Sequence, residues 1–178
     1  MLDARHYLAS ETLRNGLEIR IRALHPDDGE RIVEAFSKLD PESIYTRFFR
    51  YKKEVSEADL QLIRELDFER RVALVATLIE NGREIVIASS SYSVYADNTA
   101  EIAFVVEEDY QGLGIARHLL RHLGKIARER GITTFTAEVL YQNVAMLKVF
   151  KSSGWPMKST TEDGSVLVSL DLDGLPGG

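Results

Sequence analysis

Gly112 and Gly114, two glycines separated by one residue, lie in the loop that connects an apolar run over 100–106 to a helix-like pattern starting near Leu113. A glycine-bearing loop that opens a helix presents backbone N–H groups without intrahelical partners, at the positive end of the helix dipole. Because glycine has no side chain, an anion can approach this backbone closely. The loop therefore predicts an anion site between a strand and a helix.

The spacing of this loop excludes two common phosphate motifs. It lacks the third glycine of a dinucleotide fingerprint, and no Gly-Lys-Ser/Thr follows it as in a P-loop. A helix cap or a tight turn is the alternative interpretation of two closely spaced glycines. The neighbouring elements are therefore needed to decide between an anion site and a simple turn.

The first half of the chain predicts one strand, several helices and then three strands. Residues 17–23 alternate apolar and charged side chains, as half-exposed strands do. Pro26 opens a helix that runs to Leu39, and further helices are expected at 44–49 and 56–66. Strands are expected at 71–79, 84–95 and 100–106, the first two joined by an Asn81-Gly82 hairpin turn.

The second half predicts a strand–helix–strand unit around the glycine loop. The strand at 100–106, a helix over 113–130 and a strand at 133–140 are expected to form a right-handed unit with parallel strands. Open α/β sheets bind ligands at the carboxyl edge of such strands, which is where the loop lies. A short helix over 143–152 and a last strand over 166–170 follow.

Composition excludes several classes of function. With 178 residues the chain is expected to form one domain over 1–178. A net charge of −6 argues against a general nucleic-acid binder, and the absence of cysteine excludes disulfides and thiol chemistry. No signal-like segment or apolar run of membrane-spanning length is present, so a cytoplasmic protein without a membrane partner is expected.

Two motifs resemble the GNAT superfamily of acetyl-CoA-dependent N-acetyltransferases. The segment 110–116 is similar to the family's diphosphate loop, and 143–155 is similar to its Asn-containing helix and Gly-aromatic end. The resemblance covers about 17–171. It implies a mixed α/β fold with a mostly antiparallel central sheet, a splayed parallel strand pair and flanking helices. It also implies acetyl-CoA as co-substrate, bound by Phe104, Val105, Val106, Gln111, Gly112, Leu113, Gly114, Ile115, Ala116, Arg117, Asn143 and Phe150. The alternative for Asn143 is the N-cap of the helix over 143–152, and one residue can fill both roles.

Residues 37–49 resemble a segment of bacterial protein lysine acetyltransferases. Members of that group often carry an additional regulatory domain, for which a chain of 178 residues is expected to have no room. The resemblance implies a protein lysine as the acceptor amine. A purely structural interpretation is the alternative: Arg47 pairs with a carboxylate, and the aromatic residues near it pack in the core. Monomer and dimer both remain open.

Acetyl transfer requires a group that takes a proton from the amine, because a lysine has a pKa of about 10.4. Glu101 matches the base of the protein-acetylating group, whereas Glu138 matches the base of ribosomal-protein N-terminal acetyltransferases. The resemblance places an oxyanion-binding N–H near Val106, at a strand bulge. Phe150 stands where many members have a tyrosine general acid, so the thiolate leaves unaided or with help from Tyr141 or water.

Two other functions stay open beside protein acetylation. One is acetylation of a small-molecule amine such as a polyamine, an amino acid or an aminoglycoside, and the other is an acetyl-CoA sensor without turnover. His118 and His122 have the spacing of metal ligands on a helix, but no third ligand accompanies them. They are interpreted as a solvated pair, and no metal is expected.

Overall fold

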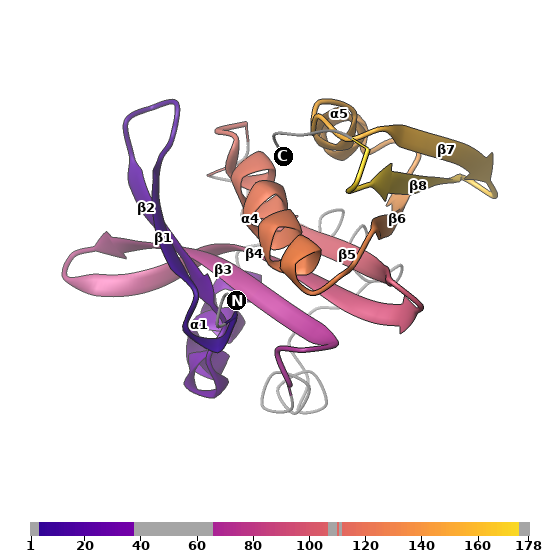
Figure 1. The fold of residues 1–178 in the computed structure, drawn as a ribbon. Coiled ribbons are helices and arrows are strands. Elements are labelled where there is room, and N and C mark those ends of the chain that lie inside the picture. Colours follow the sequence, from indigo (N-terminus) through magenta and orange to yellow (C-terminus); the bar gives the residue numbers. More distant parts are fainter. Residues whose placement is uncertain (1–3, 38–65, 107–109, 111, 175–178) are drawn as a thin grey trace.

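A single eight-stranded sheet forms the centre of the computed structural model, which describes residues 4–37, 66–106, 110 and 112–174 (Figure 1). The strand order is β1-β2-β3-β4-β5-β6-β8-β7. Four of the sequence features above lie wholly or mostly outside the described residues. They are the helix at 44–49, nearly all of the helix at 56–66, most of the segment 37–49, and Gln111. The strands are β1 (Leu8–Thr12), β2 (Glu18–Ala23), β3 (Arg71–Glu80), β4 (Arg83–Ala96), β5 (Thr99–Val106), β6 (Thr134–Leu140), β7 (Met157–Glu162) and β8 (Ser165–Asp171).

The helices cover the two faces of this sheet unequally. The long helix α4 (Ile115–Glu129) lies across one face and buries its apolar stripe against β3, β4 and β5 (Figure 1). Helix α1 (Gly29–Ser37) contacts β4, and Ile32 packs with Ala73 and Val75 in a smaller cluster on the opposite face. The remaining helices are α5 (Val144–Lys151) and the short 3₁₀ turns η1 (Ala4–His6) and η2 (Pro26–Asp28).

The predicted mixed sheet with one parallel pair is confirmed. β5 and β6 are parallel, whereas the other neighbouring strands are antiparallel. The β5–β6 register covers only Thr99–Glu101 against Thr134–Thr136, and in the described residues the pairing ends there. The two strands therefore separate toward their carboxyl ends, as the predicted splay requires. The bulge expected near Val106 is absent from the described register, because β5 pairs regularly with β4 from Ala100 to Val106.

The predicted hairpin turn at Asn81-Gly82 is confirmed by backbone geometry, and a glycine ends α4. Asn81 and Gly82 both have positive φ (53° and 76°), as a two-residue hairpin turn of mirror-image type requires. Gly131, with φ 78°, follows the end of α4 in the left-handed conformation. Two strands were not predicted from the sequence: β1, and β7 at the far edge of the sheet.

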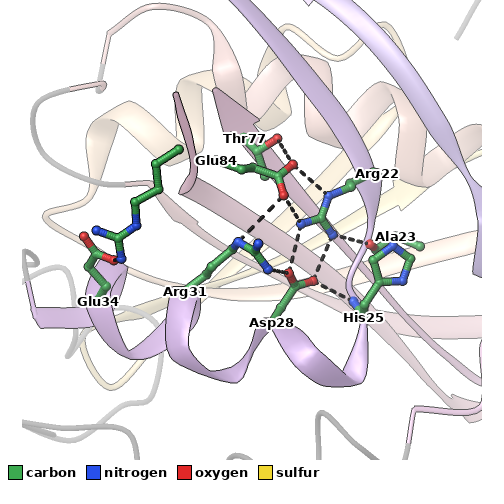
Figure 2. Close-up of polar contacts among 9 residues, drawn as sticks. Arg22, Ala23, His25, Asp28, Arg31, Glu34, Thr77 and Glu84 are labelled. Carbon is green, nitrogen blue, oxygen red and sulfur yellow. Dashed lines mark hydrogen bonds and ion pairs between the residues drawn. The ribbon is translucent and has the colours of Figure 1, made fainter. Parts of the chain in front are cut away.

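A buried ion network fastens η2 and α1 to the sheet (Figure 2). The Arg22 guanidinium donates to both oxygens of Asp28, at 2.8 and 2.9 Å, and to both oxygens of Glu84, at 3.0 and 3.2 Å. Asp28 also accepts from the His25 backbone N–H at 2.7 Å, and Arg31 donates to it at 3.2 Å. Because Asp28 is fully buried, this pairing is what makes its charge tolerable in the interior.

The network shifts the pKa values of its members. Hydrogen bonding to Asp28 raises the pKa of Arg22 further above its usual range, although burial opposes the shift. Burial acts to raise the pKa of Asp28, but the hydrogen bonds from Arg22 and His25 outweigh it and lower the pKa. The hydrogen bond from Arg22 also lowers the pKa of Glu84. All three groups are therefore charged at neutral pH.

Among the described residues, no helix is both long and apolar enough to cross a bilayer.

Candidate active site

A cavity of about 580 Å³ opens where α4 begins. Four parts of the chain line it: the end of β5, the glycine loop with the first turn of α4, helix α5 with the residues before it, and the tip of the β1–β2 hairpin. The hairpin tip, the start of α4 and α5 lie at the same end of the molecule, at the top of Figure 1. The lining residues include Phe104, Val105, Val106, Tyr110, Gly112, Gly114, Ile115, Ala116, Arg117, Asn143, Met146, Lys148 and Ser152.

The glycine loop has the conformation that its sequence predicts. Gly112 and Gly114 adopt positive φ values of 82° and 88°, which side chains disfavour. Gly114 is the N-cap of α4 and supplies no capping side chain, and the first turn of the helix contains no acidic residue. The helix therefore begins with backbone donors that no side chain caps, beside the cavity, where an anion is stabilised.

The charges on the cavity wall are all positive in the described part of the chain. Arg14, Arg117 and Lys148 line the cavity, and no described aspartate or glutamate does. The Arg117 guanidinium donates to Ser152 Oγ at 2.8 Å, and this hydroxyl donates in turn to the Lys148 carbonyl at 2.9 Å. Arg117 is thus held between α4 and α5. The wall is suited to a polyanionic ligand.

Asn143 combines a structural and a binding position. Its side-chain oxygen accepts from the Met146 backbone N–H at 3.2 Å, which confirms the predicted N-cap of α5. Because the oxygen is used in the cap, the amide –NH₂ remains a donor on a residue that lines the cavity. An extended ligand with carbonyl groups could accept from it.

Two predicted cofactor residues lie behind the cavity wall. Phe150 is 1% exposed and packs edge-on against Phe104, with ring centroids 6.0 Å apart. Leu113 packs against the main core. Neither belongs to the lining, whereas Phe104 does. Phe150 therefore supports the wall through Phe104.

The two candidate bases lie on the sheet face opposite α4. Glu101 and Glu138 are both exposed, and neither lines the cavity. Glu101 is the last β5 residue paired with β6, and its cross-strand neighbours are Ser93 and Thr136. Thr136 Oγ1 is 3.0 Å from the Tyr95 hydroxyl. Glu138 follows two residues later on β6, opposite Leu167. Both carboxylates thus lie near the point where β5 and β6 separate, outside the lining of the cavity.

The interpretation of His118 and His122 as a solvated pair is wrong. Both contact Glu11 of β1: His122 Nε2 lies 2.8 Å from its Oε1, and His118 Nδ1 lies 3.3 Å from its Oε2. Arg121 donates to Glu11 at 2.6 Å, and the Tyr7 hydroxyl hydrogen-bonds His122 Nδ1. We call these residues the Glu11 clasp. Within the described residues, no group of three or more His, Cys, Asp or Glu side chains is arranged so that it could hold a metal ion.

The Glu11 clasp attaches the N-terminal hairpin to α4. Burial lowers the pKa values of His118 and His122, so both rings are neutral at pH 7. Burial acts to raise the pKa of Glu11, but the His122 hydrogen bond and the charges around it lower it overall. Arg121 supplies the permanent positive charge. The helical spacing of the histidines was a signal in the sequence, but their partner comes from a strand that the sequence did not predict.

Comparison with known proteins agrees with this geometry. Residues 38–155 match the model of the acetyltransferase (GNAT) family. This chain is a GNAT acetyltransferase. The predicted family and fold are thereby confirmed, and the enzymatic class is N-acetyltransferase, which uses acetyl-CoA.

Several bacterial relatives of this GNAT acetyltransferase are similar over most of its length. An acetyltransferase of Pseudomonas aeruginosa is 29% identical over 159 residues, 89% of this chain and 86% of that protein. Acetyltransferase Pat of Mycolicibacterium smegmatis is 33% identical over 164 residues, 90% of this chain but only 47% of Pat, so the chain spans about half of that protein.

Two further matches bear on the fold and on the acceptor. The GNAT domain of PAT from S. lividans has the same fold with a TM-score of 0.84 and 38% identity, over 92% of this chain and 96% of that one. The ribosomal protein bS18 alanine N-acetyltransferase of Escherichia coli is 32% identical over 78 residues, 44% of this chain and 51% of that protein. The named relatives thus differ in acceptor or leave it unnamed.

Proposed function

We propose that this chain transfers the acetyl group of acetyl-CoA to the side-chain amine of a protein lysine, by direct attack of the amine on the thioester. The observation that carries the proposal is the cation-lined cavity at the start of α4, next to the diverging ends of β5 and β6. Its glycine loop and arginines suit the diphosphate, and Asn143 suits the amide-containing arm. The family uses acetyl-CoA, so these residues are its expected ligands.

The acceptor amine would approach from the opposite face of the sheet. Glu101 lies on that face at the last paired position before the strands diverge. A carboxylate there can remove the proton of an incoming ammonium group directly or through water. The amine then attacks the thioester carbonyl, the new oxyanion accepts from a backbone N–H, and the C–S bond breaks to release the CoA thiolate. A thiol pKa of about 8.5 makes this thiolate a good leaving group without a general acid.

A protein lysine is favoured by the resemblance of residues 37–49 to bacterial protein lysine acetyltransferases, together with the matches to Pat and PAT. The second candidate is an N-terminal amine. The match to the bS18 alanine N-acetyltransferase favours it, and Glu138 would then be the base. The two candidates differ in which glutamate turnover requires.

A transfer assay with labelled acetyl-CoA tests the proposal. Purified protein is incubated with a lysine-containing peptide panel, the same peptides with blocked lysines, free N-terminal peptides, and polyamines. Label in the unblocked lysine peptides alone supports the proposal. Label only at N-termini favours the second candidate, and label on polyamines alone contradicts both. Binding of acetyl-CoA without transfer to any amine would identify a sensor.

A further inference from the structure

The tip of the β1–β2 hairpin brings an arginine to the glycine loop from a distant part of the sequence. Arg14 lies in the turn between β1 and β2, where the Leu13 N–H donates to the Leu17 carbonyl at 2.8 Å and Gly16 adopts φ 85°. The hairpin places it on the cavity wall. A β-carbon built on Gly114 would lie 3.7 Å from Arg14 Nε. The guanidinium is therefore in van der Waals reach of the residue that caps α4.

We propose that Arg14 is a ligand of the acetyl-CoA diphosphate. The inference rests on the proposed use of the cavity by acetyl-CoA and adds a residue that lies far in sequence from both sequence motifs. A diphosphate on the first turn of α4 would meet backbone donors at the helix start together with Arg117 of α4 and Arg14 of the hairpin tip, which line the same cavity. Two guanidinium groups at one site can each donate to phosphate oxygens, which makes strong charge-assisted hydrogen bonds.

The surroundings of the two arginines differ. Arg117 already donates to Ser152, which holds it against α5. Arg14 makes no hydrogen bond or ion pair with the described part of the chain, and it is exposed. Its five N–H donors therefore remain available to a ligand. An arginine at a turn tip, otherwise unpaired, beside an uncapped helix start is well placed to bind an anion.

The Glu11 clasp explains why the hairpin can hold Arg14 in this position. Glu11 is three residues before Arg14, and it binds Arg121, His118 and His122 of α4. Because these contacts lie in the first two turns of α4, the helix and the hairpin form one unit beside the cavity. The hairpin tip and the start of α4 are thereby held in place before acetyl-CoA arrives, which reduces the entropy cost of binding.

Calorimetric titration of Arg14→Ala tests the proposal. The titrants are acetyl-CoA and acetyl-3′-dephospho-CoA, which share the diphosphate but differ in the ribose phosphate. We expect Arg14→Ala to weaken both by roughly tenfold. Arg20→Ala is the matched control, because Arg20 is an exposed arginine of the same hairpin that does not line the cavity, and it should bind both ligands as wild type does.

The other outcomes overturn the inference. Wild-type affinity of Arg14→Ala for both ligands removes Arg14 from the site. A loss confined to acetyl-CoA would assign the contact to the 3′-phosphate instead. Equal losses in Arg14→Ala and Arg20→Ala would indicate a nonspecific effect of charge. If the wild type binds neither ligand, the proposed function itself fails, which is distinct from a wild type that binds and an Arg14→Ala variant that binds equally well.

Discussion

Trp155 packs its indole directly on Gly124, in the middle of α4. A β-carbon at Gly124 would come within 2.8 Å of Trp155 Cζ2 and closer still to Cη2. Trp155 is 5% exposed and belongs to the main core, so the ring has little room to move. The glycine inside a long helix is therefore explained by the close approach of the segment that follows α5.

Gly124→Ala should destabilise the protein although alanine is the better helix former. The propensity gain is about 1 kcal/mol, whereas overpacking in a core costs roughly 1–3 kcal/mol. Urea unfolding should show a net loss on the order of 1 kcal/mol. In a Trp155→Phe background, which removes the outer ring atoms, the same substitution should cost less. Equal costs in both backgrounds would disprove the contact as the cause.

Gly114→Asp should abolish most acetyl-CoA binding, with a loss of at least about 100-fold, or roughly 2.7 kcal/mol. The added carboxylate would lie at the start of α4 beside Arg14, where it repels a diphosphate and competes for the guanidinium. Calorimetry measures the loss. Gly131→Asp is the matched control, since Gly131 also has positive φ but lies beyond the other end of α4. A folded Gly114→Asp variant with normal affinity would refute the proposed site.

Glu101→Gln should lower the turnover number by roughly 10²- to 10⁴-fold and leave acetyl-CoA affinity nearly unchanged. Glutamine keeps the shape of the side chain and removes its basicity. Glu138→Gln is the parallel variant on the same face, and it should turn over normally. Both are measured at pH 7 and pH 9, because more free amine at pH 9 should partly rescue the loss of a base. If only Glu138→Gln is impaired, Glu101 is not the base and an N-terminal amine becomes the better acceptor.

Phe150→Tyr should change turnover by less than about tenfold, or roughly 1.4 kcal/mol of barrier. The leaving thiolate needs little protonation, and Phe150 is buried behind Phe104 rather than on the cavity wall. Steady-state kinetics at saturating acetyl-CoA gives the comparison. A gain near a hundredfold would show that the natural site is impaired and would favour a sensor.

Acid should weaken the fold through Asp28 and Glu84. Their pKa values are lowered in the folded state, so the unfolded state binds protons first, and the free energy of unfolding falls as pH drops through their unfolded values near 4 toward the lower folded values. His118 and His122 act in the same direction from about pH 6.5 downward. Urea unfolding between pH 7 and pH 3 should record both phases.

The variant Asp28→Asn separates the contribution of Asp28 to the acid sensitivity from those of Glu84 and the two histidines. The variant should be less stable at pH 7 by several kcal/mol, because Arg22 keeps a buried charge with one partner fewer. Its free energy of unfolding should also fall less between pH 5 and pH 3 than that of the wild type. Parallel pH curves for the two proteins would show that Asp28 does not cause the acid sensitivity.

Local sequence patterns predicted the elements that have strong turn, capping or periodicity signals. They missed the two edge strands, which form by pairing with a neighbouring strand. The Asn81-Gly82 hairpin, the β5–α4–β6 unit and the cap at Asn143 follow from turn chemistry, apolar periodicity and capping. β1 and β7 lie at the two edges of the sheet, and β7 is almost wholly exposed, so neither shows the apolar alternation of a half-buried strand.

The residues of the candidate site also divide into those that could be predicted from the sequence and those that could not. The glycine loop and Arg117 could be predicted because they are contiguous with a strand and a helix. Arg14 could not, since a turn residue has no periodicity that relates it to a helix start 100 positions later. Glu11 was missed for the same reason, and with it the correct interpretation of the two histidines.

The Glu11 clasp also determines when this protein can finish folding during its synthesis. Glu11 and its partners Arg121 and His122 are 110 and 111 positions apart. At ribosomal rates of about 5–20 residues per second, roughly 5–20 seconds separate the translation of the hairpin from that of the helix that binds it. Throughout that interval the nascent hairpin has no clasp, and the start of α4 is still to come. The nascent chain therefore passes through a period in which chaperones or proteases can reach this region, and the cavity at the start of α4 can form only after it.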